Sequence, residues 1–444
     1  MRRFALALLA AALAAPLAAQ QPANLTGTWT ISTDFFGSTM YWQLHLTDTA
    51  GHLTGDLDGD KVEGTHDGSH VKFVATDPKG GYEDVTGTLA NNSFAGNLIW
   101  LRESDSADKA ASHPYTATLQ PAPRSGPPQR LEFKPTVFYR QFSAAIAPVA
   151  HLWPGDTIHT TTVDAGGTDE HGIVRSAGGN PETGPFFIET AMPGDTLAVH
   201  ILHLKPNRET AISDDGLDPR VLNPDLSVRT KDVGDDTLTW KLDLEHNVAT
   251  TTRPGDHLKQ FTVPFHPMLG CIATAPRPGP AFPTGDSGDW GGNMDFNEVV
   301  EGNTVYLPVS VPGALLFFGD AHALQGDGEL NGNALETSMD VELSVDIIHN
   351  HRTPSPRIES PTEIMAMGLE GSLDDAIKSA TNNMAHWLSD TYKLSPSEIA
   401  QVLGTLAEFR ISEVADRNAG IVLKLRKDRL ATIQPDAPKP SPTK

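Results

Sequence analysis

An eleven-residue stretch, GDAHALQGDGE (residues 319–329), holds four side chains that can bind a metal or move a proton: Asp320, His322, Asp327 and Glu329. Three glycines lie among them, so few bulky side chains separate these groups from whatever they face. Carboxylates and imidazole are ligands that Zn²⁺ and similar divalent ions accept. The spacing matches no recognised ligand signature, so the alternative, a glycine-rich loop whose acidic side chains cap turns, stays open.

The segment just before this stretch is strongly apolar and reads VYLPVSVPGALLFF (residues 305–318). A continuous apolar run of this kind is typical of a strand buried inside a sheet. We therefore expect a buried strand that ends in the polar loop and acts as a rigid platform for its side chains.

Three other places concentrate polar side chains. Asp164 ends an alternating run, HTTTVDAGG, where it is either a metal ligand or the cap of a glycine turn. Asn180 lies in the Gly/Pro loop GNPETG, a setting shared by site residues and ordinary turns. The short motif GGNMD (residues 291–295) adds Asn293 and Asp295.

The segment FHPMLGCIATAP (residues 265–276) contains two further candidates. His266 precedes apolar residues and is expected to be at least partly buried, with either a structural hydrogen bond or a functional role. Cys271 is either a nucleophile or a small packed residue. Its neighbours Leu269 and Ile272 favour packing, since no basic residue stands close in sequence to lower the thiol pKa.

The pattern of apolar residues predicts a mainly β fold in several parts. Residues 20–120 alternate apolar and polar positions between Gly, Asp and Asn turns, which predicts a small antiparallel β-barrel or β-sandwich. Residues 121–132 form a proline-rich linker. A larger β-rich domain follows over residues 133–430, and residues 431–444 have the composition of a disordered tail.

Two local signals refine the larger domain. Pro-Gly-Asp occurs at residues 154–156, 193–195 and 254–256, and each copy predicts a type II turn whose aspartate braces the start of a strand. Apolar residues recur at helical spacing over residues 373–388, and Ser395, Pro396 and Glu398 form a capping box. We therefore expect two helices to close the domain.

Composition limits the classes of partner. The formal net charge of −23 argues against nucleic acid or an anionic membrane. The first 19 residues hold two arginines, an apolar run and small residues, the layout of a secretory signal peptide, with a retained anchor as the alternative. No later stretch approaches membrane-spanning length. The single cysteine excludes an internal disulfide.

Four long blocks, in this order, resemble the acetamidase/formamidase family: GNPETGPFFIETAMPGDTLAVHI, HPMLGCIATAP, GGNMD and VYLPVSVPGALLFFGDAHALQGDGE. The resemblance covers about residues 133–427 and leaves out the N-terminal β-domain. Ala273 departs from the family pattern, which more often has glycine there. The resemblance implies a mostly β fold and the hydrolysis of short amides, such as formamide or acetamide, to a carboxylate and ammonia. It also implies a divalent metal, for which Zn²⁺ is the first choice.

Roles follow from the resemblance and from the chemistry of the side chains. The expected metal ligands are Asp164, Asp295, Asp320 and His322. The expected catalytic residues are Glu329 as general base, His266 at the oxyanion or leaving group, and Gln325 and Asp327. Asn180 and Asn293 are expected to contact substrate.

The expected partner is a small amide, and a homo-oligomer is left open. Two alternatives remain: an exported hydrolase of a larger amide or another C–N bond, and a catalytically inactive binding protein on the same fold.

The leader predicts export to the periplasm or beyond. When the chain is expressed with its leader in a Gram-negative host, we expect mature protein that begins near Gln20 in the periplasmic fraction. N-terminal sequencing measures this, and Met1 retained on soluble cytoplasmic protein would reject export.

Overall fold

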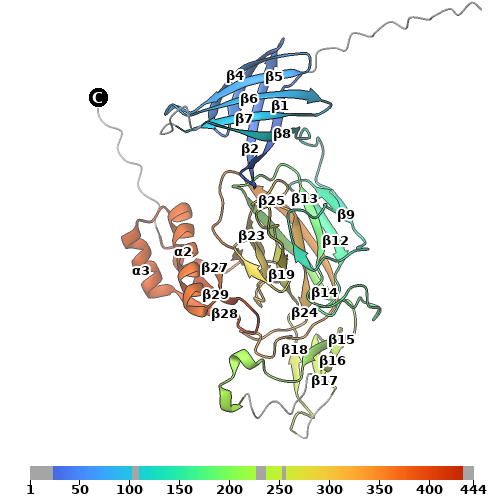
Figure 1. Cartoon of the computed structure of the whole chain (residues 1–444). Helices are drawn as coiled ribbons and strands as arrows, with labels where there is room; N and C mark the ends of the chain where they lie inside the picture. The colour runs from blue at the N-terminus through green and yellow to red at the C-terminus, as the bar shows by residue number, and fades with distance from the viewer. Residues whose placement is uncertain (1–23, 103–109, 227–236, 253–256, 434–444) are drawn as a thin grey trace, which may run out of the picture. The chain divides into compact units, whose positions relative to one another are not determined.

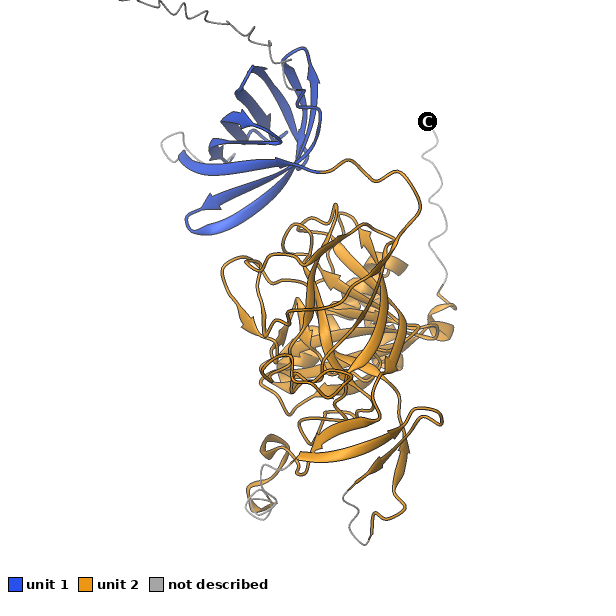
Figure 2. Ribbon diagram, turned by 90° about the vertical axis from the view of Figure 1, so that its right-hand side faces the viewer, with its two compact units in different colours: residues 1–120 blue, residues 121–444 orange. Residues whose placement is uncertain are grey.

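The structure is a computed structural model and describes residues 24–102, 110–226, 237–252 and 257–433 (Figure 1). The chain divides into two compact units, residues 1–120 and 121–444 (Figure 2). The predicted signal peptide and residues 434–444 of the predicted tail lie outside the described residues. Among the described helices, none is long and apolar enough to cross a membrane.

Unit 1 is a closed antiparallel barrel of eight strands, in which each strand pairs with the next and β8 pairs with β1. The strands are Gly27–Phe35 (β1), Ser38–Thr49 (β2), His52–Leu57 (β3), Asp60–Asp67 (β4), His70–Thr76 (β5), Tyr82–Ala90 (β6), Ser93–Leu101 (β7) and Ala111–Leu119 (β8). Alternate side chains point inward, and Trp29, Phe73 and Phe94 are among those that fill the interior. Of the two architectures left open by the sequence, the barrel is the one formed.

Unit 2 is built on two sheets that share one apolar core. The smaller sheet has the order β11-β13-β24-β19-β22-β21. Its strands are Ala150–Leu152 (β11), Thr183–Ile188 (β13), Met268–Ala273 (β19), Ser287–Gly288 (β21), Gly291–Asn293 (β22) and Leu316–His322 (β24). Every residue of β19 and β24 is buried, so this pair is the most enclosed part of the sheet.

The larger sheet has nine strands in the order β28-β29-β27-β26-β23-β14-β25-β12-β9. Its strands are Arg130–Glu132 (β9), Thr157–Thr161 (β12), Thr196–Pro206 (β14), Thr304–Pro308 (β23), Met339–Ile348 (β25), Arg357–Glu359 (β26), Glu363–Glu370 (β27), Glu408–Glu413 (β28) and Ala419–Arg426 (β29). Leu197 and Leu343 of this sheet pack in the same core as Phe186 and Phe318 of the smaller one. The mainly β fold class is therefore confirmed.

Two small sheets complete unit 2. One has four strands: Thr210–Asp214 (β15), Thr237–Asp243 (β16), Val248–Thr251 (β17) and Thr262–Pro264 (β18). The other pairs Gln141–Phe142 (β10) with Phe282–Pro283 (β20).

The apolar segment 305–318 lies in sheets as expected, but it forms two strands and not one. β23 belongs to the larger sheet and β24 to the smaller. Between them the chain turns at Pro312 and Gly313, and the φ of 76° at Gly313 suits glycine. β24 also extends further than predicted, because it runs on through Asp320 and His322.

The two predicted helices are present as Leu373–Tyr392 (α2) and Pro396–Leu406 (α3). The capping box of α3 forms as predicted, with Ser395 N donating to Glu398 Oε2 at 2.8 Å. The helices do not close the domain, however. β28 and β29 follow them, and β29 pairs with β27 beneath α2 (Figure 1). A short helix, Lys427–Leu430 (α4), and a 3₁₀ turn, Pro219–Val221 (η2), are the remaining helical elements described.

Two of the three Pro-Gly-Asp turns form as predicted. Asp156 Oδ2 accepts a hydrogen bond from Trp153 N, and Asp195 Oδ2 accepts one from Met192 N, each at 2.9 Å. The glycines of these turns have positive φ, 86° and 99°. The third copy, residues 254–256, lies outside the described residues.

Candidate metal and catalytic site

The candidate site lies where β24 ends against β19. His322, the last residue of β24, is paired with Met268 of β19 on one side. On its other side the backbone of His322 bridges to Glu336. Asp295 follows β22, the strand next to β19, and its backbone N–H donates to the carbonyl of Gly270 at 3.1 Å. Three separate parts of the chain thus place polar side chains at one point of a buried sheet.

The imidazole of His322 is held in one orientation. Its Nδ1 lies 2.9 Å from Gln325 Oε1. Gln325 in turn donates its amide N–H groups to the carbonyl oxygens of Asp295 and Ser412, so the Gln325 oxygen is the atom that faces the ring. Nδ1 therefore carries a proton, and in the neutral imidazole the lone pair of Nε2 is available to a ligand.

Three carboxylates converge on Nε2 of His322. The distances from Nε2 are 3.0 Å to Glu336 Oε1, 3.7 Å to Asp320 Oδ1 and 4.0 Å to Asp295 Oδ1. Nε2 and the two aspartate Oδ1 atoms are buried, yet they have no hydrogen-bond partner among the described residues. Because buried polar atoms are nearly always satisfied, these unpartnered atoms indicate a site for a further group.

The other oxygen of each aspartate is held by an asparagine. Asn180 Nδ2 donates to Asp320 Oδ2 at 2.9 Å, and Asn293 Nδ2 donates to Asp295 Oδ2. The two asparagines are linked as well, since Asn180 Nδ2 also lies 2.8 Å from Asn293 Oδ1. These hydrogen bonds fix each carboxylate so that its second oxygen turns toward His322. Asn180 and Asn293 line the adjoining cavity, as expected for substrate contacts, but their amides are engaged with the carboxylates.

The backbone gives these groups the space they need. A Cβ on Gly270 would lie 2.5 Å from Asp295 Oδ1 and 2.8 Å from Asp320 Oδ2, so only glycine leaves room for both oxygens. Asn180, Asp295, Asp320 and Glu329 all have left-handed φ values, from 42° to 51°. Non-glycine residues rarely adopt this conformation, and its concentration at one point is typical of a functional site.

The donor set fits a divalent cation. Two groups of three side chains place ligand atoms within 4.8 Å of one another around the same imidazole: Asp295, His322 and Glu329, and Asp320, His322 and Glu336. One imidazole with several carboxylate oxygens is a usual ligand set for Zn²⁺ and related ions. A third group of three, Asp295 with Glu413 and Asp416, extends the cluster.

Burial and mutual repulsion control the charge of these acids. Burial, followed by the nearby Glu329 and Asp320 carboxylates, raises the pKa of Asp295 well above its ordinary value. Burial also raises the pKa of Glu336 to about 7. Burial alone would lower the pKa of His322, but Glu336 and Asp320 raise it well above the ordinary value. The raised pKa values of Asp295 and Glu336 disfavour their ionised forms, and the raised pKa of His322 favours the imidazolium. A bound cation would reverse these preferences, because it favours charged carboxylates and a neutral imidazole.

Glu329 stands slightly apart from the three carboxylates near Nε2. Its Oε1 lies 4.0 Å from His322 Nδ1 and accepts a hydrogen bond from Ala334 N at 3.1 Å. Burial raises the pKa of Glu329 to about 8. Glu329 also lines a cavity of about 500 Å³, together with Asp320 and Glu336. It is therefore placed to exchange a proton with a molecule in the cavity.

The assignment of Asp164 as a metal ligand is not supported by its contacts. Its Oδ1 accepts a hydrogen bond from Thr168 N at 2.8 Å, and its Oδ2 pairs with Arg208 at 2.5 Å. Both oxygens are thus engaged, one with the glycine turn and the other with a guanidinium. The capping role left open by the sequence is the one that forms, at the rim of the cavity.

Two predicted catalytic residues lie away from the cluster. His266 was expected to be at least partly buried, but it is exposed and does not line the cavity, because the chain enters β19 only at Met268. Asp327 is exposed, and its carboxylate forms an ion pair with Arg410 at the protein surface. Gln325 belongs to the site, but it acts by orienting His322.

Four acidic residues that belong to the site were not assigned from sequence: Glu182, Glu336, Glu413 and Asp416. Glu182 is fully buried with both oxygens unpartnered among the described residues, and burial raises its pKa well above the ordinary value. Its position in the GNPETG block was the available signal. Glu336 reaches His322 through an isolated backbone bridge, and Glu413 and Asp416 follow the two helices, so spacing along the chain gives no sign of them.

Unit 2 is thus a β-rich unit with a buried histidine–carboxylate cluster, and it is similar to known proteins. The Acetamidase/Formamidase family matches residues 281–404, a range that holds Asp295, Asp320, His322, Glu329 and Glu336. An acetamidase structure from Yersinia enterocolitica covers 69% of this chain and 94% of its own, with a TM-score of 0.59 and 26% identity. An acetamidase structure from Bacillus halodurans covers 68% of this chain and 99% of its own, with a TM-score of 0.57 and 27% identity.

Sequence relatives match over a short stretch. A putative formamidase of Schizosaccharomyces pombe is 43% identical over 61 residues, 14% of this chain and 15% of the relative. The acetamidase of Mycolicibacterium smegmatis is 42% identical over 59 residues, 13% of this chain and 14% of the relative. The aligned stretch thus spans about one seventh of each curated relative. Together these matches confirm that the C-terminal two thirds of the chain resembles the acetamidase/formamidase family, with the N-terminal barrel as an addition.

Cys271 is fully buried in β19, and its setting suits packing and not catalysis. Burial, and then the neighbouring Glu182 and Asp320, raise the thiol pKa well above its ordinary value. A nucleophilic cysteine needs the opposite shift.

We expect Cys271 to react slowly with iodoacetamide in the folded protein and rapidly in denaturant, because burial blocks both access and ionisation. Mass spectrometry of the alkylated peptide over time measures the two rates. Equal rates in the folded and unfolded protein would mean that the thiol is exposed and ionised.

Proposed function

We propose that unit 2 hydrolyses short-chain amides of the formamide or acetamide type to a carboxylate and ammonia. A divalent metal assists the reaction in this proposal, and Zn²⁺ is the first choice. The observation that carries the proposal is the set of unpartnered, buried ligand atoms around His322 Nε2 beside a cavity. The likeness to acetamidases along nearly the whole length of their solved chains supports the choice of reaction.

In this proposal the ligands are His322 Nε2, Asp295 Oδ1, Asp320 Oδ1 and Glu336 Oε1. A divalent ion held there would make water more acidic and polarise the amide carbonyl. Gln325, Asn180 and Asn293 act on the ligands, because their hydrogen bonds aim the ring and the carboxylates.

Glu329 is the proposed general base. Its carboxylate takes a proton from the water whose oxygen adds to the amide carbon. The C–N bond then breaks, and Glu329 returns the proton to the departing nitrogen, which leaves as ammonia. The position of Glu329 at the cavity wall suits both transfers, because its carboxylate borders the space that the amide would occupy.

A larger amide is the second candidate substrate. The cavity of about 500 Å³ falls in the range of pockets that enclose ligands well above the size of acetamide. Thr237 and Ile212 of the small four-stranded sheet line it, so its outer wall is separate from the metal cluster. This candidate keeps the same reaction and changes only the group attached to the carbonyl.

Ammonia release measured across amides of increasing size, with metal analysis of the same purified protein, tests the function. We expect bound divalent metal and the fastest turnover with formamide or acetamide. Metal with turnover of larger amides only would select the second candidate. An intact, metal-loaded protein that hydrolyses none of the amides would contradict the proposal and favour a binding protein.

Two substitutions in the cluster separate a ligand from a base. His322→Ala should come out of purification metal-poor and inactive, since a small ligand set seldom survives the loss of one member. Glu329→Gln keeps the shape and removes the basicity, so it should retain metal while turnover falls by roughly 10²–10⁴-fold. Metal analysis and ammonia release measure both effects.

Asp327→Asn is the matched control, because Asp327 lies in the same loop but faces Arg410 at the surface. We expect it to keep both metal and rate. If Glu329→Gln loses metal while His322→Ala keeps it, the two roles are reversed. If both variants hydrolyse amides at the parent rate, the chemistry lies elsewhere.

A further inference from the structure

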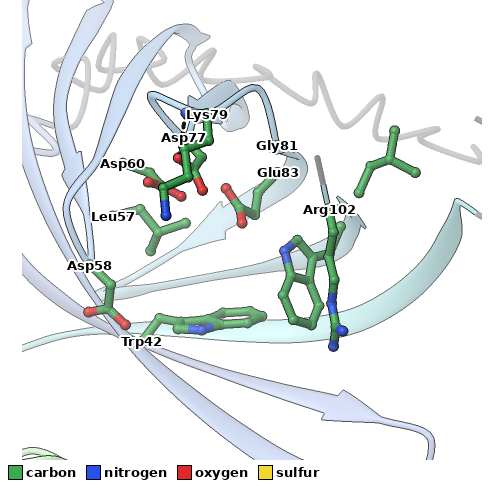
Figure 3. A pocket seen from close by; sticks show the side chains of 11 residues that line it. Trp42, Leu57, Asp58, Asp60, Asp77, Lys79, Gly81, Glu83 and Arg102 are labelled. Carbon is green, nitrogen blue, oxygen red and sulfur yellow. Dashed lines mark hydrogen bonds between the residues drawn. The ribbon is translucent and has the colours of Figure 1, made fainter. Parts of the chain in front are cut away.

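One end of the N-terminal barrel is hollowed into a cavity of about 480 Å³ (Figure 3). All of its lining residues belong to unit 1: Trp42, Leu57, Asp58, Asp60, Asp77, Lys79, Gly81, Glu83, Trp100, Leu101 and Arg102. Four of them are acidic and two are tryptophans. This combination of negative charge and aromatic surface needs an explanation, because the amide chemistry proposed for unit 2 makes no use of it.

Glu83 is the most informative of these residues. It lies on β6, where it and Val85 point into the barrel, and its exposed fraction is only 8%. Its Oε2 is buried and has no hydrogen-bond partner among the described residues. Figure 3 shows the carboxylate directed into the cavity. Burying a carboxylate without a partner is costly, so this group indicates a place for a positively charged ligand.

The other acidic side chains surround the same space. Asp60 begins β4, and Asp77 follows β5. Burial, and then Asp60 and Asp77, raise the pKa of Glu83 to about 7. Asp58 and Asp77 each accept one backbone hydrogen bond, at 2.9 and 2.7 Å, which fixes their position at the rim. The carboxylates therefore act on one another across the cavity, and a cation between them would relieve their repulsion.

Aromatic side chains form the opposite wall. The rings of Trp42 and Trp100 meet edge to face, with centroids 6.2 Å apart. The guanidinium of Arg102 already lies over Trp100, 4.8 Å from the ring centroid, so this wall accepts a cation within the chain itself. With Lys79, Arg102 brings two positive charges to a cavity that holds four carboxylates, which leaves negative charge in excess.

A bare metal ion fits this cavity less well than an organic cation. Every group of three ligand atoms found within 4.8 Å among the described residues lies in unit 2 and none in the barrel. The barrel carboxylates are thus spread around the cavity and not gathered on one point, and half of the wall is apolar or aromatic. A ligand with a charged end and an apolar body can meet both kinds of surface at once.

We propose that the N-terminal barrel binds a small organic ammonium ion, with its charged nitrogen at Glu83 and Asp60 and its apolar or aromatic substituent against Trp42 and Trp100. The two acids supply charge-assisted hydrogen bonds to the N–H groups. The tryptophans supply apolar area and aromatic contact for the substituent.

Calorimetric titration of the full-length protein with benzylammonium at pH 8 tests the proposal, and benzyl alcohol serves as the neutral ligand of similar shape. We expect measurable binding of benzylammonium and at least about tenfold weaker binding of benzyl alcohol. Glu83→Gln should weaken benzylammonium binding by about tenfold or more, because it removes the buried charge and keeps the shape. Asp60→Asn, at the half-buried mouth, should weaken it as well.

Glu63→Gln is the matched control, since Glu63 lies on the same barrel but is exposed and pairs with Lys61. It should bind benzylammonium as the parent does. Circular dichroism and thermal unfolding show whether each variant is folded, and Asp60→Asn decides the matter if Glu83→Gln is not. Equal affinity for benzylammonium and benzyl alcohol, or parent-like affinity in folded Glu83→Gln or Asp60→Asn, would overturn the proposal.

Discussion

The structure of unit 2 depends on one constraint: several carboxylates are buried around a single imidazole. Among the described residues, His322 is the only ion-pair partner of Asp295, Asp320, Glu329 and Glu336. Burial first, and then repulsion from the neighbouring Asp320 carboxylate, raises the pKa values of Asp295 and Glu336. The arrangement is stable only with protons or a cation among the oxygens. The charge of the cluster therefore changes when it binds or releases either one.

The surrounding fold holds the cluster against this repulsion. β19 and β24 are buried along their whole length, so their backbones have little freedom to separate. The absence of a side chain at Gly270 opens the space into which Asp295 and Asp320 turn. Left-handed backbone at both aspartates then aims their carboxylates at His322. An unfavourable local conformation can persist here because hydrogen bonds from Asn180 and Asn293 and the packed sheet determine it.

The sequence predicts those site residues that lie within a recognisable local pattern. Asp320, His322 and Glu329 lie in one glycine-rich stretch after an apolar run, and the structure brings them together as predicted. The sequence does not predict Glu336 as a site residue, because a backbone bridge between distant parts of the chain brings Glu336 to His322. Asp327, only two residues from Glu329, was predicted to be catalytic but lies outside the site. The turn at Gly328 sends one side chain inward and the other to Arg410, and spacing does not encode that difference.

The same limits apply to the fold. Alternation of apolar residues identified the strands of the barrel, since each strand has one face inside and one outside. The final strands β28 and β29 were not predicted, because the helical period of α2 and α3 indicated that the domain ends with these helices. β29 is nearly all buried, under α2 on one side and in the sheet on the other, so its apolar run lacks the alternation that marks a half-exposed strand.

Both units contain clustered acids, and the spacing of those acids decides what each can bind. Around His322 the ligand atoms of three side chains lie within 4.8 Å, close enough for one small ion to touch them all. In the barrel, Glu83 and Asp60 face a cavity of about 480 Å³ that is also lined by Trp42 and Trp100. A divalent metal gains most where oxygens converge, because its attraction falls with distance from each. An organic cation gains most where charge and aromatic surface are spread over its own dimensions, so similar side chains serve two kinds of ligand in one chain.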